Sequence, residues 1–426
     1  MNNVFIATIT NSNLIAVFLS SILVIFLGYI FTKLSIFKIQ WIAPFSKIVL
    51  EIALPAIAIK GFMSSLTIQK LKEQAWVLLI SILFYSILSL LSFIWIKKWK
   101  APAFINKAEP DSILLLLSNS SNQQHNKQKI LTMWMLLIFG STTTFGLPII
   151  SEFYRATPHE NVSILSISLF GVPQRIFLYT YCLIMLSGIK FNKSNLVTTI
   201  KKLAKNTTLI ITLIGFSLWL TQLIPGAGEH SEIVSKTLTL ENNKNVLAIK
   251  KANYGLNFLP IYFDAEGNKY IYNINKSIYQ LTLITPTGWI DAGVTMPYFR
   301  NIANILASLC TPLVWLSVGM KMSESRFKTI FSDKSVWLYT IIKIILIPLL
   351  MLGIMYSLYS ANRKVGAIEA LSIVVISATP PGAVPVAIAL SNNKEPTFTA
   401  RASVFSTLAS IIFIPIWIVV CQLIFI

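Results

Sequence analysis

Two segments rich in proline, glycine and hydroxyl side chains interrupt apolar stretches of this sequence. The first runs from Ser141 to Pro148 and the second from Ser377 to Pro385. Proline removes a backbone donor and clashes with the preceding turn, so a helix breaks at such a segment. Inside lipid, the freed backbone groups are tolerated only where protein or a water-filled cavity satisfies them. Matching interruptions in two halves of a chain indicate the substrate site of a transporter.

The interrupted segments supply the first candidates for substrate binding. The exposed N–H groups at the positive end of a half-helix attract a carboxylate, and threonine hydroxyls add adaptable donors. Unwound carbonyls could hold a cation. A kink used only for packing is the alternative. The candidates are Ser141, Thr143, Thr144, Gly146, Pro148, Thr379, Pro380, Pro381 and Gly382.

Three ionisable residues lie within apolar stretches, where charge is expensive and usually functional. Arg175 could bind a substrate carboxylate in a forked geometry, or form a buried ion pair that fixes helix register. Its neighbour Gln174 offers neutral hydrogen bonds to a substrate. Glu51 could carry a proton, or pair with Arg175 or a lysine. Lys343 could serve ion coupling, act as a counter-ion or be structural.

Composition identifies a polytopic membrane protein. Of its 426 residues, 55% are hydrophobic and only 12% are charged, about half the charged share of an average soluble protein. The cysteines lie in apolar runs and the histidines are far apart, so we expect no disulfide framework, metal site or cofactor. We find no Walker loop and no His-Glu-x-x-His, so we do not expect an enzyme. The net charge of +19 resides largely in short loops, which indicates topology and anionic lipid rather than nucleic acid.

About 20 apolar residues cross a membrane. Ten spans are predicted, at 13–31, 43–63, 76–96, 130–150, 162–188, 207–224, 297–319, 336–357, 366–390 and 403–425. We count 19 Lys and Arg in one set of short loops and 5 in the other. This bias predicts that both termini are extracytoplasmic. Five spans in each half then make the halves inverted repeats, with spans four and nine broken. Lys60 and Glu369 lie near span ends and are expected to reach the interface.

The predicted domains follow from this topology. Residues 1–189 form the first five-helix repeat, 190–206 a basic cytoplasmic linker, and 207–425 the second repeat. Two regions interrupt the pattern. Residues 97–129 are polar and are expected to form a mostly disordered cytoplasmic loop. Residues 226–292 are expected to form a small β-rich extracytoplasmic insertion, with strands at 256–263 and 269–275 around a turn.

Short motifs recur in a fixed order along the spans. They are Phe26-Leu27-Gly28-Tyr29-Ile30, Ala53-Leu54-Pro55-Ala56, Phe145-Gly146-Leu147-Pro148, Gln174 with Tyr179, Thr311-Pro312-Leu313, Ser317-Val318-Gly319-Met320, Lys343 with Ile347-Pro348-Leu349, and Ala378-Thr379-Pro380-Pro381. This ordered set resembles the auxin efflux carrier family of permeases. Ser141 departs from it, because the family often carries asparagine there.

The resemblance implies a homodimer in the plasma membrane. Spans one, two, six and seven would form a scaffold, and the other spans would carry the substrate in an elevator-like movement. The implied substrate is a small organic anion such as malate, malonate or an auxin-like acid. Two alternatives stay open: a transporter like the bile-acid/sodium symporters, and a membrane sensor that binds its ligand with residues 226–292.

Overall fold

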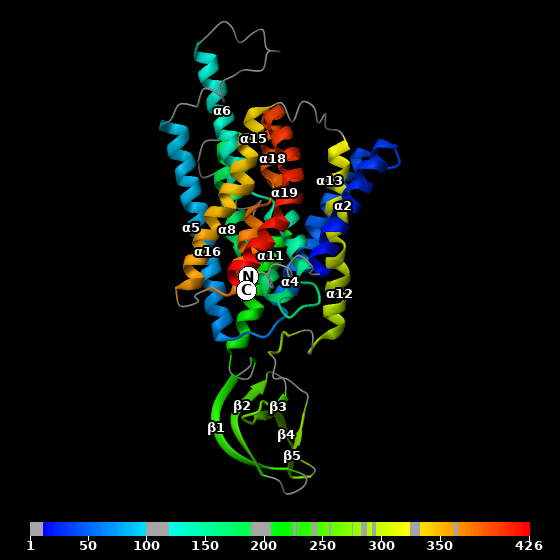
Figure 1. Ribbon diagram of the computed structural model, residues 1–426, viewed down its shortest axis with the longest axis vertical. Coiled ribbons are helices and arrows are strands. Elements are labelled where there is room, and N and C mark those ends of the chain that lie inside the picture. Colours follow the sequence, from blue (N-terminus) through cyan, green and yellow to red (C-terminus); the bar gives the residue numbers. More distant parts are fainter. Residues whose placement is uncertain are drawn as a thin grey trace.

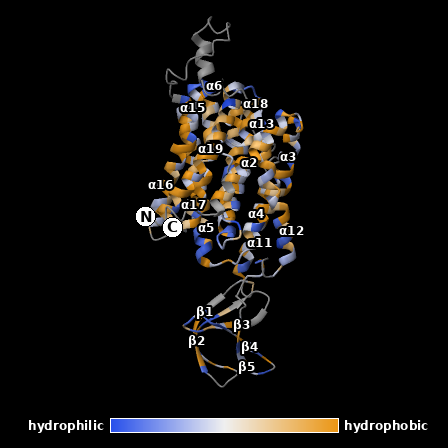
Figure 2. Cartoon of the chain, turned by 45° about the vertical axis from the view of Figure 1, so that its right-hand side comes forward, coloured by the Kyte–Doolittle hydropathy of each residue, from blue (hydrophilic) through white to orange (hydrophobic). Residues whose placement is uncertain are grey.

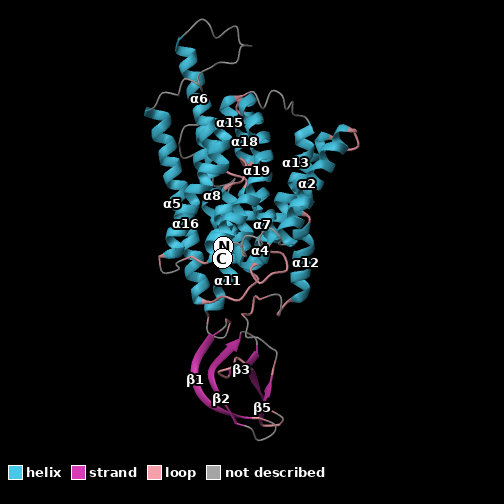
Figure 3. Ribbon diagram, in the orientation of Figure 1, coloured by secondary structure: helices cyan, strands magenta, loops and turns pink. Residues whose placement is uncertain are grey.

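The computed structural model describes residues 12–98, 119–188, 206–361 and 365–426, except 225–226, 229, 241–244, 255–256, 275, 283–287, 292–294 and 324–332. A long bundle of helices makes up most of the molecule, and a small β-sheet extends from one end (Figures 1 and 3). We call this end the sheet side. The opposite end, where α11 begins after residues 190–205, is called the linker side. Apolar residues dominate the helical bundle, whereas the sheet is mixed (Figure 2).

The first half of the bundle consists of helices up to residue 187. They are α2 (Ser12–Lys33), η1 (Ile39–Trp41), α3 (Ile42–Ile48), η2 (Val49–Ala53), α4 (Leu54–Phe62), α5 (Ile68–Lys98), α6 (Asn119–Ile138), η4 (Thr142–Gly146), α7 (Leu147–Phe153), α8 (Glu160–Phe177), η5 (Leu178–Cys182) and α9 (Leu183–Ser187).

The second half of the bundle is also helical, and the β-sheet is inserted between two of its helices. Its helices are α11 (Thr207–Leu220), η6 (Thr221–Leu223), α12 (Pro297–Ser308), α13 (Cys310–Ser323), α15 (Lys334–Ile341), η7 (Ile342–Leu346), α16 (Ile347–Ser360), α17 (Ala367–Ser377), α18 (Ala383–Ser391) and α19 (Pro396–Phe425).

Helical residues occupy all ten predicted spans. Within the described ranges, six helices are long and apolar enough to cross a membrane, and three shorter apolar helices accompany them. The chain is therefore a membrane-embedded helical protein, as predicted, while the inverted repeat stays a prediction. The predicted loop 97–129 is only partly described: residues 99–118 lie outside the described residues, whereas residues 119–129 form the start of α6 instead of a loop. These residues are polar in sequence, and they lack the apolar stripe from which an amphipathic helix is predicted. Most of the predicted linker, 190–205, lies outside the described residues.

Four helices contain a π-helical segment: η2, η4, η5 and η7. Three of them are followed directly by a proline in the first turn of the next α-helix, namely Pro55, Pro148 and Pro348. Proline cannot donate to the carbonyl one turn earlier, and a wider turn relieves its clash with that carbonyl. The prolines thus account for three of the four π-segments, which often mark functional sites.

Glycines allow two pairs of helices to pack closely. α2 lies against α13, where a Cβ on Gly28 would meet the backbone oxygen of Leu316 at 2.5 Å and one on Gly319 would collide with the backbone of Ile25. α11 lies against α4, where a Cβ on Gly215 would meet the Phe62 ring at 2.5 Å. Span one therefore packs on span seven, and span six on span two.

The insertion is a five-stranded antiparallel sheet in sequence order, β1 (His230–Thr239), β2 (Asn245–Tyr254), β3 (Asn257–Phe263), β4 (Lys269–Asn273) and β5 (Ile278–Leu281). This confirms the predicted β-rich character of the insertion. Asp264 fixes the turn between β3 and β4, because its carboxylate accepts hydrogen bonds from the backbone N–H of Asn268 at 2.8 Å and from the Tyr270 hydroxyl at 3.0 Å. Burial alone would raise the pKa of Asp264, but hydrogen bonds, led by that from the Asn268 side chain, lower it below its ordinary value.

A short stem anchors the sheet to the bundle. Ser65, in the loop after α4, donates to the Asp291 carboxylate at 3.0 Å and accepts from the Gly288 N–H at 3.1 Å. The Trp289 indole donates to the Thr221 hydroxyl at 2.8 Å. These contacts tie the segment that follows the sheet to helices on the sheet side.

Candidate functional site

The two interrupted segments meet in the middle of the bundle and pair through their backbones. The Ser141 N–H donates to the Pro380 carbonyl at 2.7 Å, and the Gly382 N–H donates to the Phe139 carbonyl at 2.9 Å. Gly140 and Pro381 thereby form an isolated antiparallel bridge. We call this feature the crossing. It joins α6 and η4 in the first half to α17 and α18 in the second half.

Side chains satisfy the remaining carbonyls around the breaks. At the end of α6, the Tyr339 hydroxyl donates to the Leu136 carbonyl at 3.1 Å. At the end of α17, the Ser410 hydroxyl donates to the Ala378 carbonyl at 3.1 Å. Irregular backbone is tolerated at membrane depth only with such partners.

Lys343 belongs to this supporting structure. Its ammonium is buried and donates to the Leu137 carbonyl at 2.9 Å, at the negative end of α6. A Cβ on Gly140 would lie 2.8 Å from the Lys343 Nζ, so a larger residue at this position would displace the end of the lysine side chain. A cation near helix C-termini is stabilised by the helix dipole. The Lys343 ammonium thus compensates the partial negative charge at the end of α6, next to the crossing. Lys343 does not line the cavity described next.

A cavity of about 250 Å³ lies beside the crossing and reaches the start of α11 on the linker side. η2, η4, α8, η5, α11 and α18 contribute its walls. Its polar lining comprises Glu51, Ser141, Thr143, Thr144, Gln174, Arg175, Tyr179, Asn206, Thr207 and Thr208. A second cavity of about 190 Å³ borders the same crossing and contains Pro380 and Pro381. The two cavities share Ser141 and Thr144.

Arg175 is the buried charge of the larger cavity. Only 6% of the residue is exposed, and its Nη1 has no hydrogen-bond partner in the described part of the chain. A Cβ on Gly171 would lie 3.3 Å from that nitrogen, so the glycine one turn earlier leaves room for the guanidinium. A buried charge without a partner is costly. Arg175 lines the cavity, although its Nη1 is itself closed off from solvent, so the residue brings a positive charge to this wall.

Two half-helix ends face the same cavity. Ser141 is the N-cap of η4, and its hydroxyl contacts the Thr144 hydroxyl at 2.5 Å. Gly382 is the N-cap of α18, whose first residues Ala383 and Val384 line the cavity. N-terminal N–H groups have no partner within their own helix and carry partial positive charge. Both ends thus add to the positive potential around Arg175.

The predicted substrate-binding residues divide into three groups. Ser141, Thr143, Thr144, Gln174, Arg175 and Gly382 line the larger cavity, and Pro380 and Pro381 line the smaller one. Gly146, Pro148 and Thr379 line neither. A Cβ on Gly146 would meet the Thr379 methyl at 3.0 Å, so these residues pack against each other behind the crossing.

Gln174 braces the crossing more than it faces a ligand. Its amide nitrogen donates to the Gly140 carbonyl at 2.7 Å, and its amide oxygen accepts from the Thr142 hydroxyl. Both ends of the amide are therefore engaged. This places the neighbouring Arg175 on a helix that is tied to the crossing itself.

Three residues that were not predicted as site residues complete the cavity near α11. Asn206 is the N-cap of α11, accepts from the Leu209 N–H at 2.8 Å and donates to the Tyr179 hydroxyl at 3.3 Å. Thr207 and Thr208 follow it. An apolar span begins with Asn-Thr-Thr, just as η4 begins with hydroxyl-bearing residues. This similarity is the sequence pattern from which these three residues could be predicted as site residues.

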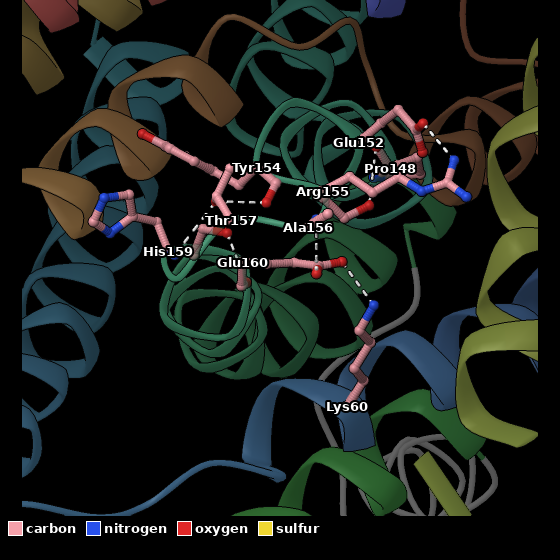
Figure 4. Close-up of polar contacts among 11 residues, drawn as sticks. Lys60, Pro148, Glu152, Tyr154, Arg155, Ala156, Thr157, His159 and Glu160 are labelled. Carbon is pink, nitrogen blue, oxygen red and sulfur yellow. Dashed lines mark hydrogen bonds and ion pairs between the residues drawn. The ribbon is translucent and has the colours of Figure 1, made fainter. Parts of the chain in front are cut away.

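Figure 4 shows two ion pairs on the sheet side. Lys60 on α4 and Glu160 at the start of α8 form an ion pair of 2.6 Å. Arg155 pairs with Glu152 at 2.9 Å, and this hydrogen bond raises the pKa of Arg155. Lys60 therefore does not simply extend to the interface as predicted. Glu369 does not either, because it is buried and accepts from the Gln74 amide at 3.2 Å.

Comparison with known families supports the class of protein that this architecture suggests. Residues 289–418 match the family model described as "Membrane transport protein", which is the domain of the auxin efflux carrier family. The predicted resemblance is thus confirmed for this part of the chain, which contains Lys343 and the second interrupted segment. No curated protein matches the sequence. The chain is a membrane-embedded protein with a transport-family region.

Proposed function

We propose that this protein is a secondary transporter that binds a small organic anion in the cavity beside the crossing. The observation that carries this proposal is the buried guanidinium of Arg175, whose Nη1 has no partner among the described residues. A guanidinium binds a carboxylate through two parallel hydrogen bonds. The half-helix ends of η4 and α18 would share the same anion, as helix N-termini do.

Support for transport comes from the site's architecture. Broken helices from two halves cross at the ligand site, which is the arrangement expected of secondary transporters with repeats. Span one packs closely on span seven, and span six packs closely on span two. In two related halves, span one corresponds to span six and span two to span seven, so these two contacts are equivalent. We further propose an elevator-like movement of spans three to five and eight to ten against this scaffold, in a homodimer in the plasma membrane.

The direct test is ligand binding by purified full-length protein. Mono- and dicarboxylates should raise its melting temperature, and Arg175→Gln should weaken the best ligand by about 100-fold, since a charge-assisted bidentate contact is lost. Arg175→Lys keeps the charge but not the fork, so it should lose less. The matched control is Arg155→Gln, which removes a surface guanidinium that already has a partner and should change affinity by less than about twofold.

The proposal fails if Arg175→Gln and Arg175→Lys both bind carboxylates as the wild type does. If carboxylate binding depends on Arg175, uptake into liposomes at two pH values, with and without sodium, identifies any coupled ion. A sensor, the alternative class, would bind ligand through the sheet. Deletion of residues 230–281 should leave carboxylate binding intact in a transporter and abolish it in such a sensor.

A further inference from the structure

The cavity contains a carboxylate as well as a guanidinium. Glu51 lines the same cavity as Arg175, and it is exposed to solvent. It lies in η2, where the wider π-turn ahead of Pro55 changes which residues face inward. Among the described residues, Glu51 makes no hydrogen bond and no ion pair. Span two and span five therefore present opposite charges to one cavity.

The two charges are not in direct contact. Glu51 is solvent-exposed, so water screens its attraction to Arg175. Glu51 and Arg175 form no ion pair, and the Arg175 Nη1 has no hydrogen-bond partner among the described residues. The alternative that Arg175 is satisfied by Glu51 is thereby removed. A ligand with a negative and a positive group would satisfy both walls.

We propose that the substrate is a small zwitterion of the amino-acid type, with its carboxylate at Arg175 and its ammonium at Glu51. This rests on the proposed function and adds a second contact at the same site. A volume of about 250 Å³ lies below the range of about 300–1,000 Å³ that drug-sized ligands occupy. A compact solute therefore fits better than a large one.

The charges also rank competing ligands. A monocarboxylate would leave Glu51 desolvated and without a partner once the cavity closes. A dicarboxylate would in addition bring a second negative charge toward Glu51. We therefore expect amino acids to bind best, monocarboxylates less well and dicarboxylates least. Loss of Glu51's charge should remove this order, whereas loss of Arg175's charge should weaken all three classes.

A four-carbon series tests the ranking with one chain length: 4-aminobutanoate, 2-aminobutanoate, butanoate and succinate. Each is measured by thermal shift and by competition for uptake on full-length protein. In the wild type, the better amino compound should bind at least about tenfold more tightly than butanoate, with succinate weakest. In Glu51→Gln this preference should fall to within about twofold, and succinate should improve. Glu152→Gln, at a glutamate paired on the sheet side, is the matched control and should keep the wild-type order.

Three outcomes would overturn the inference. One is butanoate or succinate binding the wild type as tightly as both amino compounds. Another is an unchanged preference in Glu51→Gln. The third is that Glu51→Gln removes the pH dependence of uptake equally for every ligand without altering their order, which would make Glu51 a proton carrier instead.

The two proposals fail in distinguishable ways. If Arg175→Gln weakens every carboxylate while the order of ligands ignores Glu51, only the zwitterion inference is lost. If no compound of the series binds the wild type, the proposed function is lost with it. Should Glu51→Gln fail to fold, Glu51→Asp keeps the charge but withdraws it by one methylene, and the amino preference should then be intermediate.

Discussion

On the sheet side of the bundle, Lys60 pairs with Glu160 at 2.6 Å, and Arg155 pairs with Glu152 at 2.9 Å. In the cavity on the linker side, Arg175 and Glu51 share a space without pairing, and the Arg175 Nη1 lacks a partner among the described residues. Both regions lie between α8 and the span that contains η2 and α4. The same two spans are therefore tied together at one end and hold unpaired charges at the other.

This difference separates structural charges from charges available to a ligand. A pair such as Lys60 and Glu160 is satisfied within the chain and needs nothing further. An unpaired buried guanidinium is stable only if the surrounding fold holds it in place, and the Gln174 contacts tie the adjacent backbone of α8 to the crossing. The linker-side cavity therefore presents charges that no partner in the described chain engages, whereas the charges that line the cavity of about 520 Å³ on the sheet side are paired.

Among the changes that leave the charges of the cavity intact, the largest expected effect concerns the broken backbone that borders the cavity. Pro148→Ala and Pro381→Ala should each reduce uptake by about tenfold or more. Pro381 lies in the break between α17 and α18, where alanine restores a donor, and Pro148 follows the π-turn of η4, which alanine would no longer require. Membrane insertion, judged by expression and detergent extraction, should be unchanged. Wild-type flux in both variants would contradict the assignment of the crossing.

A third proline provides the control for this experiment. Pro415 lies inside α19, which continues through it without a break. Pro415→Ala should therefore retain most of the wild-type uptake. A comparable loss in that variant would show that proline removal harms the bundle in general.

A smaller effect is expected from the paired charges on the sheet side. Lys60→Met and Glu160→Gln should each destabilise the protein by about 1–2 kcal/mol, since either leaves a half of a largely buried pair without its partner. The side chains of this pair are only 13% and 12% exposed. The double variant should recover part of the loss, as measured by thermal unfolding in detergent. Additive losses would show that the two side chains do not interact.

The smallest effect is confined to the sheet. The pKa of Asp264 is lower in the folded sheet than its ordinary value of 3.8, so its contribution to stability is present above that value and is lost as the pH falls below it. Hydrogen exchange in β3 and β4, corrected for its intrinsic pH dependence, should accelerate below about pH 4. Asp264→Asn should be less protected at neutral pH and should lose this transition. Identical pH profiles in both proteins would contradict the role of Asp264.

Several features of the fold could be predicted from the sequence because they depend on local patterns. Apolar length located the spans, and the turn at 264–268 located the hairpin of β3 and β4. The start of α6 was missed, because residues 119–129 are polar and their helix cannot be recognised from an apolar stripe. The candidate site was partly predictable: ionisable residues within apolar stretches identified Arg175 and Glu51, but could not say whether they pair.

By itself, the sequence determined that this chain is embedded in a membrane, where its helices break and which charges lie at membrane depth. These follow from hydropathy, from the missing N–H of proline and from the cost of burying charge. The tertiary structure alone decided which groups meet. It placed Lys343 behind the crossing, engaged Gln174 in bracing it, paired Lys60 with Glu160, and left Arg175 facing a cavity. Partners that lie from 34 to 206 residues apart are set by the packing of helices, which local patterns do not encode.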